Sequence, residues 1–307
     1  MALQDLQLTP AAARCPDLRD RAAAAWELLK DCRLCPRRCG VNRLAEELGA
    51  CRSGSKAVVA SFGPHFGEEP PLVGFGGSGT IFLSNCNLRC IFCQNYEISH
   101  GGEGIAVAPE QLAQMMLALQ ARGCHNVNFV TPTHFMPQIL QALVIAVQHG
   151  LRIPIVWNCG GYESVEALKL LDGVVDIYMP DFKYSSAEIA ARLSGTPLEG
   201  PSAYPAACME AIKEMHRQVG DLILDKRGIA VRGLLVRHLV LPNGLAGTEE
   251  IMRFLASLSK DTYVNIMDQY RPCYKAHTVP EINRRITSQE YEAAVEAARR
   301  AGLHRFA

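Results

Sequence analysis

Residues 79–95, GTIFLSNCNLRCIFCQN, hold the pattern that decides the fold. The first part, 79–85, is a short apolar run of the length and composition of a buried strand. It leads directly into three closely spaced cysteines, Cys86, Cys90 and Cys93. The stretch therefore predicts a strand followed by a loop rich in soft metal ligands.

Five later segments share the character of the first run. They are short and almost continuously apolar, and they cover residues 126–131, 154–158, 175–180, 233–241 and 262–268. Strands whose two faces are both covered in a parallel sheet have this composition. Together with 79–85 they predict a six-stranded parallel sheet.

Helices are predicted between these strands. In 109–122 the side chains of Leu112, Met115, Met116 and Leu119 share one face, as an amphipathic helix requires. Further helices are predicted at 138–148, 163–172, 186–194, 205–218, 248–259 and 288–301. Six strand–helix units imply right-handed crossovers. Because a closed barrel needs eight units, we predict an α/β fold with a partial (β/α)6 TIM-like barrel.

The N-terminal part has a different character. A helix is predicted over 17–31, and the segment from Cys32 to Pro71 shows no sustained period. We therefore predict two units, an N-terminal helix and cysteine-rich module (1–71) and the barrel (72–307).

Four cysteines, Cys32, Cys35, Cys39 and Cys51, lie close together in this N-terminal module. A segment so short and poor in apolar residues needs help to stay folded, and a metal held by four thiolates would supply it. Zinc would be a closed structural site, whereas an iron–sulfur cluster could relay electrons. The third alternative is a set of reduced, metal-free cysteines.

Composition excludes several classes of protein. The 307 residues carry 31 Lys plus Arg and 31 Asp plus Glu, and this balance argues against a general nucleic-acid binder. No apolar run approaches the roughly 20 residues that span a bilayer. Met1–Pro16 lacks the features of a secretory signal. We expect a cytoplasmic protein without a membrane partner, whose twelve cysteines are metal ligands or buried side chains and not disulfides.

Polar residues collect where the predicted strands end. They are Thr131 to His134 after the second strand, Asn158 to Tyr162 after the third, Asp181 to Tyr184 after the fourth, Arg237 and His238 in the fifth, and Gln269 to Arg271 after the sixth. The carboxyl ends of parallel strands meet on one side of a barrel. These residues therefore predict a single site beside the three cysteines.

The spacing of Cys86, Cys90 and Cys93 predicts the metal. Three thiolates in one loop can hold a [4Fe–4S] cluster and leave one iron without a protein ligand. That iron can bind a small molecule through an amine and a carboxylate. A structural zinc site would need a fourth ligand, for which His100 is the nearest candidate.

The motif Cys-x3-Cys-x-aromatic-Cys after the first strand resembles the radical S-adenosylmethionine (SAM) superfamily. The stretch 77–95 and the later Asp181-Phe182-Lys183 resemble relatives of pyruvate formate-lyase activating enzyme. The segment from Cys32 to Arg43, CRLCPRRCGVNR, resembles the PflX-type branch of these relatives. The resemblance extends from about residue 30 to about residue 275.

This resemblance implies a reaction. SAM would bind the open iron, and an electron from a low-potential donor would cleave its S–C5′ bond. The resulting 5′-deoxyadenosyl radical would take a hydrogen atom from a substrate, with a glycine of a glycyl-radical enzyme as the favoured target. One alternative is a small-molecule or peptide substrate. Another is a non-catalytic iron–sulfur or zinc-stapled electron-transfer module.

The resemblance also implies roles for residues at the strand ends. Asp181 and Lys183 resemble an Asp-x-Lys pair that holds the cofactor, and Lys183 would face the methionyl carboxylate. Asn158 occupies the place of a polar residue after the third strand. Arg237 and His238 resemble a basic pair that contacts cofactor or substrate. Further candidates are Phe92, beside the adenine, and the 269–271 segment, which would close the pocket or touch the substrate.

One departure from the superfamily concerns the methionyl amine. Most members carry a Gly-Gly-Glu-like segment after the second strand, where this chain has Thr131-Pro132-Thr133-His134. Thr131, Thr133 or His134 would then hold the amine. Gly101-Gly102-Glu103 lies too close to Cys93 in the sequence and is interpreted as a mobile loop.

Overall fold

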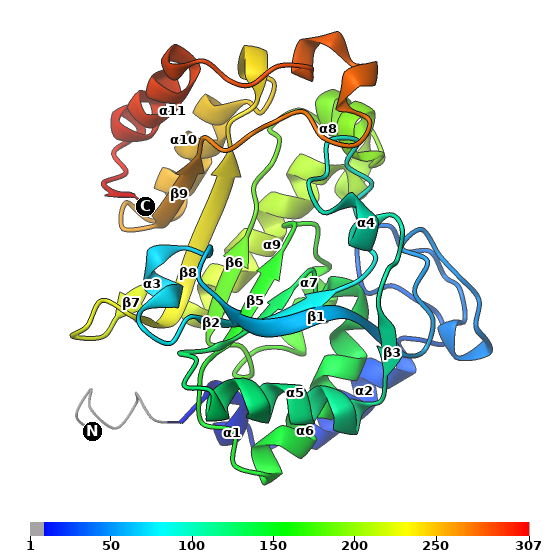
Figure 1. Cartoon of the computed structure of the whole chain (residues 1–307). Coiled ribbons are helices and arrows are strands. Elements are labelled where there is room, and N and C mark those ends of the chain that lie inside the picture. Colours follow the sequence, from blue (N-terminus) through cyan, green and yellow to red (C-terminus); the bar gives the residue numbers. More distant parts are fainter. Residues whose placement is uncertain (1–8, 307) are drawn as a thin grey trace.

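The computed structural model describes residues 9–306, and a single sheet organises the chain (Figure 1). The expectation that Met1–Pro16 holds no secretory signal falls in part on residues 1–8, outside the described residues. The strand order is β10-β9-β8-β6-β5-β4-β2-β1-β3, with β7 paired to β8. Among residues 9–306, no helix has the length and apolar composition to cross a membrane.

All six predicted strands form, next to one another and parallel. They are β2 (Ser78–Leu83), β4 (Val127–Val130), β5 (Ile155–Cys159), β6 (Ile177–Pro180), β8 (Ala230–Leu239) and β9 (Tyr263–Met267). Both faces of β5 and β6 are buried throughout, which explains their continuous apolar runs. The partial-barrel prediction is confirmed.

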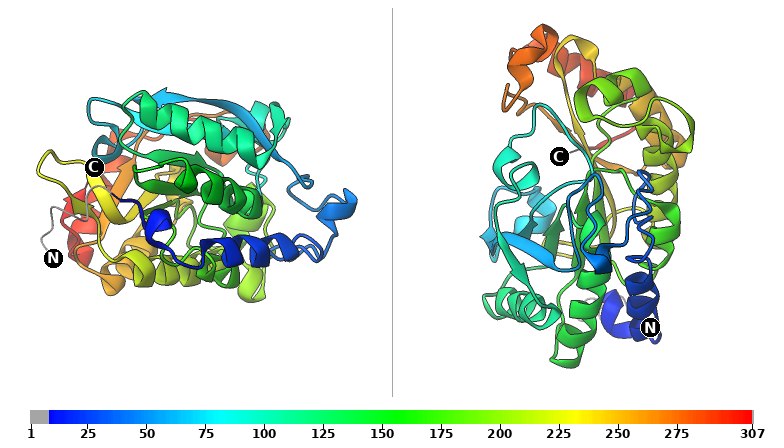
Figure 2. Two further views of the ribbon diagram at one scale, coloured as in Figure 1. Left: turned by 90° about the horizontal axis from the view of Figure 1, so that it is seen from below. Right: turned by 90° about the vertical axis from the view of Figure 1, so that its right-hand side faces the viewer.

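The predicted helices cover this sheet. They are α2 (Leu18–Glu27), α5 (Pro109–Ala121), α6 (Met136–Gln148), α7 (Val165–Lys169), α8 (Ala187–Ser194), α9 (Tyr204–Val219), α10 (Thr248–Leu258) and α11 (Ser288–Ala301). The buried face of α5 includes Leu112, Met116 and Leu119, as predicted, whereas Met115, predicted on the same face, is only partly buried. The N-terminal helix α2 packs against α6, and α6 packs against α5 (Figure 2).

Residues 57–71, predicted to be irregular, contain ordered elements. Strand β1 (Ala57–His65) pairs antiparallel with β2, and α3 (Pro70–Val73) follows it. The short β3 (Ile105–Val107) pairs with the outer side of β1. Buried and partly exposed positions are mixed along β1, so it lacks the continuous apolar run by which the other strands were recognised. Residues before the predicted boundary at 71 thus belong to the same sheet as the barrel.

Four further α-helices and strands in the described residues are short, and several 3-10 turns lie between the elements. The four are α1 (Ala11–Arg14), α4 (Tyr96–Ser99), β7 (Ile223–Leu224) and β10 (Arg305–Phe306). Helix α4 directly follows the loop that carries the three barrel cysteines, and in Figure 1 the N-terminal cysteine segment lies beside it.

The fully buried Arg43 ties this N-terminal segment to the barrel. Its guanidinium donates to the carbonyl of His134 (2.6 Å) and twice to that of Gly54 (3.1 and 2.7 Å). Hydrogen bonds to these carbonyl oxygens thus replace the hydrogen bonds to water that the guanidinium loses when it is buried. The module is fixed at the side of the barrel where the strands end.

Candidate functional site

A pocket of ≈ 290 Å³ lies at the carboxyl ends of the six central strands. That volume is at the lower limit of the roughly 300–1,000 Å³ typical of small-molecule sites. Every one of the six strands, or the loop that follows it, contributes to the lining. Among the lining residues are Cys86, Cys90, Phe92, Cys93, Thr131, Asn158, Cys159, Asp181, Lys183, Arg237, Met267 and Gln269. The predicted convergence of the strand ends is therefore present.

Cys86, Cys90 and Cys93, the cysteine triad, all line this pocket. Residues 84–95, the triad loop, are held by main-chain bonds. The amides of Arg89 and Ile91 donate to Ser194 (3.1 Å) and Leu193 (2.9 Å) at the end of α8, and the carbonyl of Ile91 accepts from Lys275 (2.8 Å). The loop is thereby anchored from two distant parts of the chain.

Each thiol of the triad has a polar neighbour. The Cys90 and Cys93 Sγ atoms lie 2.9 Å and 3.1 Å from the hydroxyls of Ser194 and Ser99. The amide of Leu88 donates to Cys86 Sγ over 3.4 Å. Burial raises the pKa of both Cys86 and Cys90, so a metal would have to replace their protons.

The donor set of this loop fits an iron–sulfur cluster. Soft thiols are the ligands that such clusters take, and all three face one pocket. Within residues 9–306 no three His, Cys, Asp or Glu side chains converge as they would around a single metal ion.

A charged network forms the side of the pocket beside the triad. Asp181 contacts Lys183 Nζ through Oδ2 (2.5 Å) and Arg237 Nε through Oδ1 (2.7 Å). Arg237 also donates to Asn158 Oδ1 (2.7 Å). Burial acts to raise the pKa of Asp181, but Arg237 and Lys183 outweigh it and the pKa lies below its ordinary value. Asp181 is therefore ionised and orients two cations.

Two acidic residues beneath Arg237 were not predicted. Arg237 Nη1 lies 3.7 Å from Glu68 Oε2 and 3.6 Å from Glu69 Oε1. Asn265 donates to Glu69 Oε1 (3.1 Å), whereas the buried Glu69 Oε2 has no partner. Burial, more than the neighbouring carboxylates, raises the pKa of Glu68 to about 7. The acidic pair precedes α3 and follows none of the six predicted strands, so sequence spacing gave no signal for it.

Phe92 and Thr131 lie in the pocket lining. The Phe92 ring meets Tyr270 edge-on, with centroids 5.7 Å apart. Thr131 has φ 60, a left-handed conformation that a β-branched residue rarely adopts, and its amide donates to Asn158 (2.8 Å). Such strain costs about 1–3 kcal/mol and concentrates at functional sites.

The structure does not bring Thr133 and His134 to the pocket. They lie in a 3-10 turn (Thr133–Phe135) that directs both side chains into the core. The Thr133 hydroxyl donates to the buried Glu163, and His134 Nε2 contacts the Ser84 carbonyl at 2.8 Å. Burial lowers the pKa of His134 to about 3, so the ring is neutral. Of the three candidates for the methionyl amine, the structure places only Thr131 at the pocket.

His238 also lies outside the pocket lining. Neighbours along a strand point to opposite faces, so His238 points away from the side occupied by Arg237. Its ring contacts the Phe182 carbonyl (2.8 Å) and the Thr248 hydroxyl (2.9 Å). Burial lowers its pKa to about 4, and it is a neutral core residue.

Two further segments singled out in the sequence are residues 269–271 and 101–103. Gln269 lines the pocket, whereas Tyr270 is buried and donates to the Ile282 carbonyl (2.7 Å). Arg271 is exposed. Glu103 is also exposed, and its carbonyl accepts from the Ser84 hydroxyl.

The four N-terminal cysteines are gathered in residues 32–52, the four-cysteine module. The amide of Gly40 donates to the Cys32 carbonyl (3.0 Å), and the amide of Ala50 donates to Cys39 Sγ (3.4 Å). Burial raises the pKa of Cys35 to about 12, and the nearby Cys51, Cys32 and Cys39 add to this effect. Backbone contacts thus bring together four cysteines that span twenty positions.

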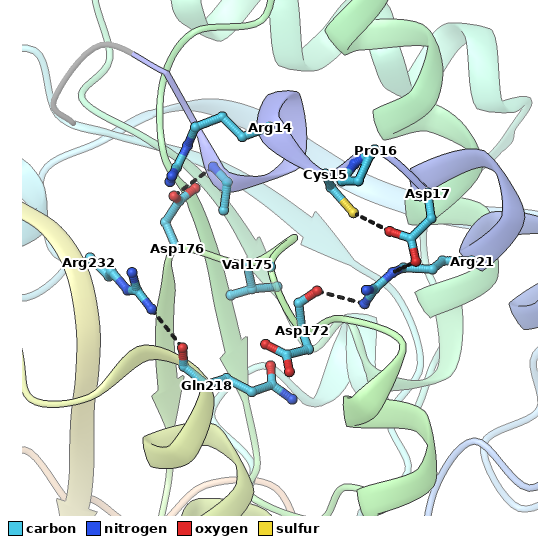
Figure 3. Close-up of a pocket in the computed structure, with 12 residues that line it drawn as sticks. Arg14, Cys15, Pro16, Asp17, Arg21, Asp172, Val175, Asp176, Gln218 and Arg232 are labelled. Atoms are coloured by element: carbon cyan, nitrogen blue, oxygen red, sulfur yellow. Dashed lines mark hydrogen bonds and ion pairs between the residues drawn. The ribbon is translucent and has the colours of Figure 1, made fainter. Parts of the chain in front are cut away.

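A second pocket, of ≈ 240 Å³, lies at the opposite end of the barrel (Figure 3). Several of its charged groups already have main-chain partners. Asp176 accepts from the amides of Ala11 and Ile155 (both 2.8 Å), and Arg21 donates to the Asp172 carbonyl (2.6 Å). This pocket is a seam that attaches the N-terminal helices to the barrel.

Comparison with known protein families is consistent with the interpretation of the triad as an iron–sulfur site. Residues 80–224, which contain the triad, match the model of the radical SAM superfamily, so this part of the chain is a radical SAM domain. A radical SAM domain implies a [4Fe–4S] cluster and SAM as cofactors.

Relatives extend the match over nearly the whole chain. The uncharacterized protein MJ0674 of Methanocaldococcus jannaschii is 36% identical over 299 residues, which cover 94% of this chain and 80% of that protein. The uncharacterized protein MJ0808 of the same organism is 24% identical over 287 residues, covering 85% and 77%. The chain belongs to the family of MJ0674.

Solved structures share the fold. The FeFe-hydrogenase maturase HydG from Carboxydothermus hydrogenoformans gives a TM-score of 0.50 at 15% identity, covering 73% of this chain and 51% of that chain. A second HydG structure, described as a maturase of the [FeFe]-hydrogenase, gives 0.51 at 12% identity, covering 74% and 50%. The chain thus spans about half the length of these HydG chains, and the likeness concerns the fold alone.

Proposed function

We propose that this protein cleaves SAM reductively at a [4Fe–4S] cluster held by Cys86, Cys90 and Cys93, and abstracts hydrogen from a substrate. When bound, the cluster and SAM supply the electron transfer and the 5′-deoxyadenosyl radical. The observation that carries the proposal is that the triad and the Asp181 network line one pocket, and that the triad, Asp181 and Lys183 lie within the radical SAM match at residues 80–224.

The residues of the chain would bind and orient SAM. Burial acts to lower the pKa of Lys183, but Asp181 and Cys90 raise it above its ordinary value, so Lys183 is a cation suited to the methionyl carboxylate. Thr131 offers a hydroxyl to the methionyl amine, and Phe92 offers a ring edge to the adenine. Asn158 and Arg237 complete the polar side of the pocket.

The substrate we favour is a glycine in a glycyl-radical enzyme. This rests on the resemblance of residues 77–95, of the Asp181-Phe182-Lys183 motif and of residues 32–43 to the PflX-type relatives of pyruvate formate-lyase activating enzyme. We also propose that the protein acts in the cytoplasm and receives its electron from a low-potential donor. We further propose the predicted division into a cysteine-rich module, 1–71, and a barrel, 72–307, with one change: β1 belongs to the sheet of the barrel.

The four-cysteine module is proposed to bind a metal through Cys32, Cys35, Cys39 and Cys51. The Cys39 sulfur accepts a hydrogen bond from the Ala50 amide, and such a bond would support a sulfur that binds a metal. The metal is zinc or an iron–sulfur cluster. Metal analysis of anaerobically purified protein, before and after mutation of Cys35, distinguishes these from a metal-free module.

The test of the main proposal is anaerobic reconstitution with iron and sulfide, then reduction in the presence of SAM and assay for 5′-deoxyadenosine. The matched control is Cys90→Ala, with Cys15→Ala as a thiol variant at the other end of the barrel. Product from wild type and Cys15→Ala but not from Cys90→Ala is expected. Equal product from all three would contradict the cluster assignment, and no product from any would favour the electron-transfer alternative.

The substrate is tested separately. Incubation with a glycyl-radical enzyme should yield a glycyl radical signal in electron paramagnetic resonance (EPR) spectra. Rapid 5′-deoxyadenosine formation without that signal would favour a small-molecule or peptide substrate.

A further inference from the structure

Arg37 reaches from the four-cysteine module to the triad loop. Its Nε donates to the Asn87 carbonyl (2.5 Å), Nη1 to that of Gly195 (2.9 Å) and Nη2 to that of Ser194 (3.4 Å). One guanidinium thus connects the triad loop to the C-terminal end of α8. The planar geometry of arginine suits such multiple donation, which a lysine cannot reproduce.

Two of the three residues that accept from Arg37, Asn87 and Ser194, lie directly beside a triad cysteine. Asn87 follows Cys86 in the chain, and its side chain donates to the Tyr162 carbonyl (2.6 Å). Ser194 holds its hydroxyl 2.9 Å from Cys90 Sγ. The Arg37 guanidinium lies over the Tyr162 ring, 5.9 Å from its centroid. Moving Arg37 would therefore loosen both ends of the Cys86–Cys90 segment.

The position of Arg37 depends on the fold of the module. Arg37 lies between Cys35 and Cys39, in a turn closed by the Arg38 amide and the Cys35 carbonyl (3.0 Å). Arg38 has φ 45, a left-handed conformation that the module must maintain. A metal on Cys35 and Cys39 would bind both sides of this turn.

We propose that the four-cysteine module, with its metal bound, is a clamp that positions the triad loop through Arg37. This inference rests on the proposed function, because it requires metal at both cysteine groups. Arg37 is a positioning residue and touches neither SAM nor iron. Residues that orient ligand-bearing elements typically change metal affinity or activity by roughly 10–100-fold when mutated.

The test compares Arg37→Ala with Arg33→Ala in the full, reconstituted protein. Arg33 is the matched control, because it lies in the same module but pairs at the surface with Asp31 (2.8 Å). Arg37→Ala is expected to lower the rate of 5′-deoxyadenosine formation at least ~10-fold. It should also reduce the iron held at the triad and alter the EPR spectrum of the reduced cluster with SAM. Arg33→Ala should match wild type in all three.

Two further variants separate clamping from general damage. Arg37→Lys keeps the positive charge but has fewer hydrogen-bond donors, so it should be more active than Arg37→Ala and less active than wild type. If Arg37→Ala does not fold, Arg37→Lys is compared with wild type in its place. Cys39→Ser should reproduce the loss seen in Arg37→Ala. The double variant should be no worse than either single one, because both act on the same connection.

The outcomes separate the two proposals. An active wild type with Arg37→Ala indistinguishable from Arg33→Ala would overturn the clamp alone. A strictly additive double variant would also overturn it, since the two residues would then act independently. An inactive wild type that yields no 5′-deoxyadenosine would overturn the proposed function itself, and the clamp with it.

Discussion

The two ends of the barrel carry pockets of similar size, ≈ 290 Å³ at the carboxyl end and ≈ 240 Å³ at the amino end. Both are lined by cysteine, aspartate and arginine. At the amino end, Asp176 and Arg21 bond to the main chain, and the lone Cys15 donates to Asp17 (3.2 Å).

The pocket at the carboxyl end differs from the pocket at the amino end in its side chains. It holds three thiols in one loop and charged side chains that orient one another. It also contains Thr131, whose backbone is strained, whereas none of the described non-glycine residues lining the amino-end pocket has a positive φ. Charge and volume alone therefore do not identify the site; soft donors and stored strain do.

The largest expected difference between the ends concerns their thiols. Cys90→Ala should lower 5′-deoxyadenosine formation by at least ~100-fold, because removing a ligand costs more than removing a residue that supports one. Cys15→Ala should retain full activity. The rate is measured after anaerobic reconstitution, with iron content as the second readout. A comparable loss in both variants would remove the distinction between the two ends.

The second difference is the dependence of stability on pH. Burial raises the pKa of Glu163, near the carboxyl end, to about 7 and that of Asp176, at the amino end, to about 6. Both are protonated in the folded state at a pH where the unfolded chain has lost those protons. The folded state then binds more protons, so the free energy of unfolding falls as pH rises.

The size and range of this effect follow from the same values. The raised pKa of Glu163 corresponds to a loss of about 3 kcal/mol between pH 4.5 and pH 7. The contribution of Asp176 is complete by about pH 6. Urea unfolding at a series of pH values measures the slope. Glu163→Gln should reduce the dependence of the free energy of unfolding on pH between pH 6 and 7, and Asp176→Asn should reduce it at lower pH. An unchanged pH dependence in Glu163→Gln would refute the raised pKa of Glu163.

The third difference concerns the two aspartates. Asp181→Asn leaves Lys183 and Arg237 without their anionic partner, so the KM for SAM should rise about tenfold, equivalent to ~1.4 kcal/mol. Asp176→Asn should leave that KM unchanged, because the partners of Asp176 are the amides of Ala11 and Ile155 at the other end of the barrel. Steady-state kinetics of both variants are the measurement. An unchanged KM in Asp181→Asn would mean that the network is structural.

The smallest expected effect concerns strain at the carboxyl end. Thr131→Gly relieves the left-handed conformation and should raise the free energy of unfolding by about 1 kcal/mol. Thr131→Ala keeps the strain and should bring no such gain, while both variants lose the hydroxyl offered to SAM. Denaturant unfolding measures the difference. Equal stabilities for the two variants would show that the backbone at this position is relaxed.

The fold was largely predictable because the six central strands have short apolar runs. Strands β2, β4, β5 and β6 are buried at almost every position, whereas β9 alternates between buried and half-buried positions. The convergence of the triad with Asn158, Asp181 and Arg237 followed, because parallel strands bring their carboxyl ends together. Strand β1 was missed since its burial pattern is mixed.

The predictions about the site that were wrong or incomplete also have causes in the structure around single residues. His238 directly follows Arg237, and the alternation of a strand sends the two side chains to opposite faces. Thr133 and His134 enter a 3-10 turn that the sequence did not reveal. Glu68 and Glu69 reach Arg237 from a segment that precedes the whole barrel. Their proximity depends on tertiary packing, which a single sequence without an alignment does not display.

The anchoring of the triad loop has a consequence for biosynthesis. Its carbonyl at Ile91 is bonded by Lys275, and its amide at Arg89 by Ser194. A nascent chain that has released the three cysteines from the ribosome still lacks both anchors. The ligand loop therefore reaches its anchored shape only after the chain has been synthesised through Lys275, so a cluster that requires this shape would be inserted after most of the barrel exists.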